Sequence, residues 1–360
     1  MKPPRTNAIV AMALFAALSV ACSETTAPLP KEELAPRVSI LAVGDTGRRH
    51  RPFAAWSEGQ LAVARAMAME DARSPVDAIV FLGDNFYENG LQRFEMVERI
   101  RENLALPYCR FIETTGPRAD EIASHCRLEP GARNVVPLLA VVGNHDLMDG
   151  ESMAIQCQEV ADFVSNWKLS CDGIATLELD GGLSVIAYDS ARPGWQKEGQ
   201  RLRDAIRESK GPWRVLVAHH PVGVDRDDRP APTPFVPSAI KAAGVPVHAH
   251  LGGHNHNLQL FVNEESLPPL RIVAGSGARA RPEVTEPHPD RVYGAARLGF
   301  ARVDLTGEGS RERLLVSLYA APPYPFLFWV EPELVARWSI DSQGKARDEG
   351  HPLASDNDAG

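Results

Sequence analysis

Five apolar, largely β-branched runs, each ending in a polar corner that contains glycine or proline, constrain this chain more than any other feature. They are Val38 to Gly47, Val76 to Tyr87, Val135 to Asp146, Trp213 to Pro221 and Val245 to His256. Nearly continuous apolar runs of this kind are typical of strands that are buried on both faces. The polar residues follow the apolar part of each run, so we expect them to gather at the carboxyl ends of the strands.

Helical patterns separate some of these runs and begin at Glu58, Gly194 and Ser238. Further strand-like runs begin at Gly182, Arg271, Gly299 and Arg313. Alternation of strands and helices predicts an α/β fold. No internal repeat and no second-domain boundary is evident, so the sequence predicts one domain over residues 37–344.

Two segments depart from this regular alternation. Residues 88–134 contain two cysteines and several prolines and are predicted to be an irregular insertion. Residues 345–360 form a polar tail that is predicted to be disordered.

Composition limits the partners of the folded chain. The 360 residues are 44% hydrophobic, enough to bury a core, and the formal net charge is −9. A net negative charge argues against a nucleic-acid partner or an anionic membrane surface. An anionic substrate would therefore need a local positive centre, which a metal site supplies.

The N-terminus has the pattern of an export signal. Lys2 and Arg5 precede the apolar run AIVAMALFAALSVA, and Cys22 follows small residues. The ending SVAC resembles a bacterial lipobox, with Ser19 where leucine is usual, which makes Cys22 the lipidated first residue of a membrane-anchored lipoprotein. The alternative is simple cleavage nearby and a periplasmic or secreted product. Residues 1–22 are thus predicted to be a signal peptide with a lipobox, and residues 23–36 a flexible tether.

The cysteine count agrees with export. Apart from Cys22 the chain has four cysteines, an even number in an oxidising compartment. Three connectivities are possible in principle, and proximity in sequence favours Cys109–Cys126 and Cys157–Cys171. No CxxC spacing occurs, so a zinc–cysteine site is not predicted.

Side chains that bind metals stand at the end of each of the five runs. They are Asp45; Asp84 and Tyr87; Asn144 and His145; His219 and His220; and His254 and His256. A single Asp after a strand is usually a turn or helix cap, and the pair His254 and His256 alone could be a polar turn. Five such corners in one chain, gathered at strand ends, instead predict a metal site.

The five corners resemble, in their order along the chain, the five motifs of the metallophosphoesterases. They read GDTG, GDNFY, GNHD, VLVAHHP and GHNH. Within that superfamily they are most similar to purple acid phosphatases of the small tartrate-resistant type, over roughly Val38 to Leu318. Many relatives carry a metal-binding histidine where this chain has Gly47, and they lack the tyrosine that stands here as Tyr87. The resemblance implies a four-layer sandwich, in which helices flank two central sheets.

The resemblance also implies the role of each ligand in a dinuclear centre. Asp45, Tyr87 and His256 would hold one metal, Asn144, His219 and His254 the other, and Asp84 would bridge both. Phenolate and carboxylate suit Fe(III), whereas imidazole and amide oxygen suit Zn(II), Fe(II) or Mn(II). Two metals about 3.5–4 Å apart can acidify a water and clamp a phosphate. His145 would stabilise the transition state or protonate the leaving alcohol.

Other polar residues near the motifs are placed by their neighbours in the sequence. Arg48 and Arg49 could contact the phosphate or lie on a solvated surface, and His220 is expected to form a wall of the pocket. His248 and His250 alternate with apolar residues, which favours a place in the core. The family's second catalytic histidine lies in a region that here reads DRDD, Asp225 to Asp228, which puts an acid pH optimum in doubt.

These patterns predict an exported, metal-dependent phosphomonoester hydrolase, in which a metal-bound hydroxide attacks phosphorus. The expected partner is a small phosphorylated substrate, with no nucleic acid and no membrane contact except through a lipid on Cys22. One alternative is a phosphodiesterase or nucleotidase with the same centre and a wider pocket, to which residues 88–134 could contribute. An alternative of another class is a surface binding protein with a relic metal site, and the intact ligand set speaks against it.

Overall fold

The structure is a computed structural model that describes residues 35–49, 59–126, 128, 132–192, 194–224, 233–282, 287–323 and 329–350. The predicted signal peptide with Cys22, almost all of the predicted tether, residues Asp225 to Asp228 and residues 351–360 lie outside this range. Residues from Ala35 onward group into one compact unit.

The first sheet has eight strands in the order β15-β14-β13-β12-β1-β2-β3-β4. Its parallel half consists of β1 (Val38–Val43), β2 (Ala78–Phe81), β3 (Leu138–Ala140) and β4 (Trp167–Leu169). Its antiparallel half consists of β12 (Gly299–Thr306), β13 (Arg313–Ala320), β14 (Glu333–Asp341) and β15 (Ala346–Asp348).

The second sheet has seven strands in the order β11-β9-β10-β8-β7-β6-β5. The parallel strands are β6 (Leu183–Tyr188), β7 (Trp213–Val217), β8 (Ala249–Gly252) and β10 (Leu270–Ala274). The antiparallel strands are β5 (Ile174–Leu179) at one edge, β11 (Arg291–Ala295) at the other edge, and β9 (Leu258–Val262) between β11 and β10.

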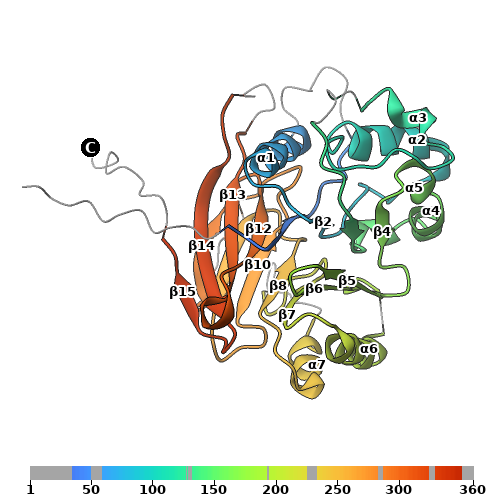
Figure 1. Ribbon diagram of the computed structural model, residues 1–360. Helices are drawn as coiled ribbons and strands as arrows, with labels where there is room; N and C mark the ends of the chain where they lie inside the picture. Colours follow the sequence, from blue (N-terminus) through green and yellow to red (C-terminus); the bar gives the residue numbers. More distant parts are fainter. Residues whose placement is uncertain are drawn as a thin grey trace, which may run out of the picture. The chain divides into compact units, whose positions relative to one another are not determined.

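Two groups of helices cover the outer faces of the sheets (Figure 1). The first group packs on the first sheet and consists of α1 (Gly59–Arg73), α2 (Met96–Ile100), α3 (Asp120–Ala123), α4 (Ser152–Gln158) and α5 (Val160–Phe163). The second group packs on the second sheet and consists of α6 (Trp195–Glu208) and α7 (Val236–Ala243). Short helical turns occupy Arg93–Glu95, Arg101–Ala105, His145–Leu147 and Gly309–Arg311.

The alternation of side chains along each strand produces the layers. In β1, Leu41 and Val43 pack under the first group of helices, whereas Ile40 and Ala42 pack against the second sheet. In β6, Val185 faces the first sheet and Ile186 packs under α6 and α7. The prediction of an α/β fold with two sheets between helices is therefore confirmed.

The structure corrects three details of the sequence analysis. Residues 88–134 are not wholly irregular, because α2, α3 and two short helical turns lie within them. The prediction that the chain is disordered from Lys345 onward is wrong for its first residues, because Ala346 to Asp348 form a strand that pairs with β14. Strands β4, β5, β9, β11 and β14 were not predicted; most are short or lie at a sheet edge.

Two disulfides lie on the side of the first group of helices, one between two loops and one between α4 and a loop. Cys109 is bonded to Cys126, with 5.0 Å between their Cα atoms, and Cys157 to Cys171, with 5.8 Å. Both pairs match the prediction from proximity in sequence. Among the described residues, no helix is long and apolar enough to cross a membrane.

Candidate metal centre

The five polar corners meet at one place, because both sheets contribute the carboxyl ends of parallel strands. β1, β2 and β3 are adjacent and parallel in the first sheet, and β7 and β8 are adjacent and parallel in the second. The sheets approach closely here: the Gly44 amide donates to the Ala274 carbonyl across them at 2.8 Å. The loops that follow these strands are thus brought to one edge, where α/β proteins bind ligands.

The three residues predicted for the first metal form one tight group. The Tyr87 hydroxyl donates to Asp45 Oδ1 at 2.7 Å and lies 3.1 Å from His256 Nε2. His256 Nε2 is 3.2 Å from the same Asp45 oxygen. All three side chains are buried.

The three residues predicted for the second metal form another. Asn144 Oδ1 lies 3.0 Å from His219 Nε2 and 3.0 Å from His254 Nδ1. The two histidine nitrogens are 3.2 Å apart. Three ligand-type atoms from three different corners therefore point at one another.

Asp84 lies between these two groups. Its Oδ1 accepts the His145 backbone N–H at 2.9 Å and is 3.5 Å from His219 Nε2. Ligand atoms of Asp45, Asp84 and His219 all lie within 4.8 Å of one another. Asp84 is thus placed where a ligand shared by the two groups would be.

Three of the seven residues have strained backbones. Asp45, Asp84 and His254 have φ angles of 58°, 53° and 65°, in the left-handed region that residues other than glycine rarely adopt. Such conformations cost free energy and tend to occur at functional sites, where the surrounding structure enforces them.

The charges of the cluster are shared between acidic and basic groups. Burial opposes the charged form of Asp45, but hydrogen bonding with His256 and the nearby His219 overcome it and lower the Asp45 pKa to about 2. Burial, and then the carboxylates of Asp45 and Asp84, raise the Tyr87 pKa well above its ordinary value. Burial opposes a charged His219, yet Asp84 and Asp45 raise its pKa overall. The buried carboxylates of Asp45 and Asp84 therefore favour the binding of positively charged groups at this site.

The donor set fits a pair of metal ions. It comprises two carboxylates, a phenol, an amide oxygen and three imidazoles, which covers the ligand preferences of both hard and borderline metals. His219 Nδ1 donates to the Leu82 carbonyl at 2.9 Å, so Nε2 carries the lone pair and faces the cluster. This second hydrogen bond is the usual way in which a metal-binding histidine is oriented.

His145 lies beside the cluster rather than in it. Its Nδ1 donates to the Glu88 carbonyl at 2.6 Å, and its ring centroid is 4.5 Å from that of Tyr87. The ring is partly exposed, whereas Tyr87 is buried. His145 can therefore reach a bound molecule through Nε2.

Three comparisons relate this site to known proteins. The sequence profile of the family described as calcineurin-like phosphoesterase matches residues 38–258, more than half of the chain and all five corners. The chain belongs to the calcineurin-like phosphoesterase family. The prediction of a metallophosphoesterase enzyme is thereby confirmed, and a dinuclear metal centre and a small phosphorylated substrate follow from the family.

The chain is also similar to purple acid phosphatase 17 of Arabidopsis thaliana, with 26% identity over 266 residues, 68% of this chain and 69% of the relative. Among solved structures, the purple acid phosphatase PPD1 from yellow lupin has a TM-score of 0.57 at 12% identity, covering 84% of this chain and 53% of that one. GAP50, the anchor in the inner membrane complex of Plasmodium, has a TM-score of 0.56 at 15% identity, covering 79% and 84%. At these identities the solved structures show a shared fold.

Gly47 shows why this calcineurin-like phosphoesterase has a tyrosine in place of the histidine that the resemblance associates with the first motif. A Cβ at Gly47 would lie 2.2 Å from the Asn85 carbonyl carbon and oxygen. The Tyr87 amide donates to the Gly47 carbonyl at 2.7 Å, which holds the two loops in contact. This backbone leaves no room for a histidine side chain, whereas Tyr87 reaches Asp45 from the second loop.

The other predicted contacts are placed around the cluster. The Arg48 guanidinium is 5.4 Å from the centroid of the Tyr87 ring and 4.0 Å from the Glu88 carboxylate, so it lies beside the site. Arg49 instead pairs with Glu95 and Glu98 at 3.0 and 3.4 Å. The His220 ring is 4.4 Å from that of His254, so it lies beside the second group.

His248 and His250 are buried in the fold, as the alternation with apolar residues predicted. His250 Nε2 is 2.9 Å from the Tyr188 hydroxyl, and the His248 ring is 4.3 Å from the Trp213 ring. Neither lies in the metal-ligand cluster among the described residues.

The sequence analysis missed the residues that hold the motif loops in place. Asp146 is fully buried and accepts from the backbone N–H groups of Gly143, Asn85 and Phe86 at 2.9–3.1 Å. Burial, and then Asp84, raise its pKa to about 6. The position of Asp146 inside GNHD could have indicated this role, because a carboxylate that immediately follows two site residues can accept hydrogen bonds from their loop.

The sequence around Arg99 did not indicate that this residue would support the site. It is buried on α2 and donates to the backbone carbonyls of Tyr87 and Gly47, each at 2.7 Å. These two bonds join the first and second motif loops from a helix in the segment that was predicted to be irregular.

Proposed function

We propose that this calcineurin-like phosphoesterase is a phosphomonoester hydrolase of the purple acid phosphatase type. The observation that carries the proposal is the convergence of the two three-residue groups on either side of Asp84. Asp45, Tyr87 and His256 would hold one metal, Asn144, His219 and His254 would hold the other, and Asp84 would contribute to both. When bound, the two ions supply Lewis acidity and a local positive charge for the phosphate.

The nature of the ligands supports a pair of one trivalent and one divalent ion. The phenol and carboxylate of the first group favour Fe(III), and the amide and two imidazoles of the second favour Zn(II), Fe(II) or Mn(II).

His145 serves the leaving group. Because its Nδ1 proton is held by the Glu88 carbonyl, Nε2 is the nitrogen that carries and transfers the catalytic proton. A partly exposed ring next to Tyr87 can deliver that proton to an ester oxygen without itself binding metal.

Two further groups bind the phosphoryl oxygens. Arg48 stands over the Tyr87 ring and supplies a cationic donor on the side of the first group. His220, whose ring packs on those of His254 and His219, supplies a second donor on the other side.

We infer that the enzyme acts outside the cytoplasm. The export pattern of residues 1–22 and the two disulfides support this location, because disulfides persist in oxidising compartments. A lipid on Cys22 is the proposed anchor.

A phosphate-release screen on the mature protein, with metal analysis of the same sample, tests the function. We expect two metals per chain and faster hydrolysis of monoesters than of diesters. Faster turnover of diesters or nucleotides would favour a phosphodiesterase or nucleotidase instead. A protein that holds metal but hydrolyses no phosphate ester would be a binding protein.

The colour of the protein tests the Fe(III) assignment. A tyrosinate bound to Fe(III) absorbs visible light, so the isolated protein should be coloured, and Tyr87→Phe should lose the colour while retaining some activity. A colourless wild type that is active and fully loaded with metal would instead indicate a divalent pair.

A further inference from the structure

A buried serine contacts His220 at two points. The Ser190 hydroxyl accepts the His220 backbone N–H at 2.9 Å and is 3.0 Å from His220 Nδ1. Ser190 is 1% exposed and follows β6 by two residues. One hydroxyl thus holds both the backbone and the ring of His220, which sets the direction of the opposite Nε2 edge.

The ring so oriented adjoins the candidate metal centre. Its centroid is 4.4 Å from that of His254 and 4.9 Å from that of His219. One ring nitrogen of His220 lies within 4.8 Å of ligand atoms of both neighbours. A phosphoryl oxygen bound on the side of these two residues is therefore within reach of His220.

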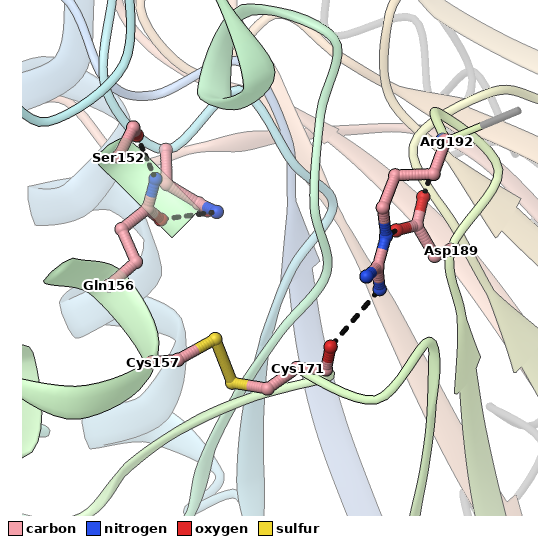
Figure 2. Close-up of a disulfide and its surroundings, with 7 residues drawn as sticks. Ser152, Gln156, Cys157, Cys171, Asp189 and Arg192 are labelled. Carbon is pink, nitrogen blue, oxygen red and sulfur yellow. Dashed lines mark hydrogen bonds and ion pairs between the residues drawn. A yellow bond between two sulfur atoms is a disulfide. The ribbon is translucent and has the colours of Figure 1, made fainter. Parts of the chain in front are cut away.

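The turn that contains Ser190 is hydrogen-bonded to residues 171–173 through Asp189 and Arg192. The buried Asp189 carboxylate accepts the backbone N–H groups of Ala191 and Arg192 at 2.8 and 3.0 Å and pairs with the Arg192 guanidinium. Arg192 Nη2 in turn donates to the Cys171 carbonyl at 3.1 Å (Figure 2). The Asp189 backbone N–H donates to the Gly173 carbonyl at 2.8 Å. This hydrogen bond and that of Arg192 join the turn to residues 171–173.

The Cys157–Cys171 disulfide attaches this turn to α4 (Figure 2). Gln156, next to Cys157, donates to Asp146 at 3.1 Å, and Ser152 on the same helix accepts from Gln156. Asp146 in turn holds the loops of Asp84 and Asn144 through the Asn85 and Gly143 amides. The disulfide therefore connects two sets of residues. Gln156 and Asp146 hold the loops of the candidate metal ligands on the first sheet, and the turn with Ser190 holds His220 on the second sheet.

We propose that Ser190, Asp189 and Arg192, anchored by the Cys157–Cys171 disulfide, position His220 to bind the phosphoryl group of the substrate. This proposal rests on the phosphatase function proposed above. Ser190 is a positioning residue, because it acts through His220, and we call the chain of contacts from Cys171 through Arg192 and Asp189 to Ser190 the positioning strap.

The first test removes the hydroxyl of Ser190. Ser190→Ala should raise KM and weaken the binding of inorganic phosphate about fivefold, the scale of one hydrogen bond, while kcat and metal content stay close to wild type. Ser190→Thr keeps the hydroxyl and should restore phosphate binding. Ser317→Ala removes an equally buried hydroxyl on β13 and should change neither.

The second test compares the two disulfides. Replacing Cys157 and Cys171 by alanine should weaken phosphate binding as Ser190→Ala does, because the strap loses its attachment to α4. Replacing Cys109 and Cys126 by alanine removes a disulfide that is not bonded to the strap and should leave phosphate binding unchanged.

Phosphate binding is measured by calorimetry on the metal-loaded protein, so the test does not depend on turnover. If no ester is hydrolysed but the serine and disulfide effects on phosphate binding are found, the proposed function fails and the strap stands. Equal phosphate affinity in wild type and Ser190→Ala, at equal metal content, would overturn the strap. So would equal effects of the two disulfide replacements, or a threonine variant that behaves like alanine.

Discussion

At the scale of single residues, the structure places two neighbours in the chain in different surroundings. Asn144 faces His219 and His254, whereas the next ring, that of His145, turns to the Glu88 carbonyl. We predict that His145→Ala retains both metals but lowers kcat by roughly 10²–10⁴-fold, the scale of a positioned acid–base group. The loss should shrink for nitrophenyl esters, whose leaving groups need little protonation. His254→Ala, the control, should lose metal; equal metal loss in both variants would show that this division of roles is wrong.

At the scale of secondary-structure elements, a buried ionic network joins β1, β12 and α1. Arg302, 2% exposed, donates to Asp304 at 2.8 Å, and its guanidinium lies 3.6 Å from the Glu70 carboxylate. We predict that Arg302→Met lowers the free energy of unfolding by about 3–5 kcal/mol, because the buried Asp304 carboxylate loses its cation and Glu70 keeps only its pair with Arg73. Arg297→Met breaks a surface pair with Glu333 and should cost about 1 kcal/mol or less. Urea unfolding compares them, and similar losses in the two variants would argue against the network.

At the scale of the whole molecule, two buried histidines make the fold sensitive to acid. Burial, and then Arg214, lower the His248 pKa to about 4, and burial, and then Arg271, lower that of His250 to about 3. Both pKa values lie below the unfolded value of 6.5, so the unfolded chain binds protons first as pH falls. The stability these neutral rings contribute is complete above that value and declines through the window down to about pH 3. We predict a loss of about 2 kcal/mol per histidine at pH 5. Urea unfolding at pH 7.5 and pH 5, at equal metal content, should show a smaller decline in the variant with His248→Gln and His250→Gln; an unchanged decline would assign the acid sensitivity to other groups.

The sequence by itself determined the class of the fold and the members of the candidate site, because both are written in contiguous stretches. A run such as Val38 to Val43 must be buried on both faces, and the polar corner after it must lie at the strand end. The spacing of Asp84 and Tyr87, and of His254 and His256, likewise depends only on local chain. The tertiary structure alone decided the pairing of the edge strands, the burial of Arg99 and the contacts from Asp146 to Gln156 and from Ser190 to His220. Those features join segments that are separated along the chain, and a hydrogen bond or a buried charge acquires its partner only when packing brings such segments together.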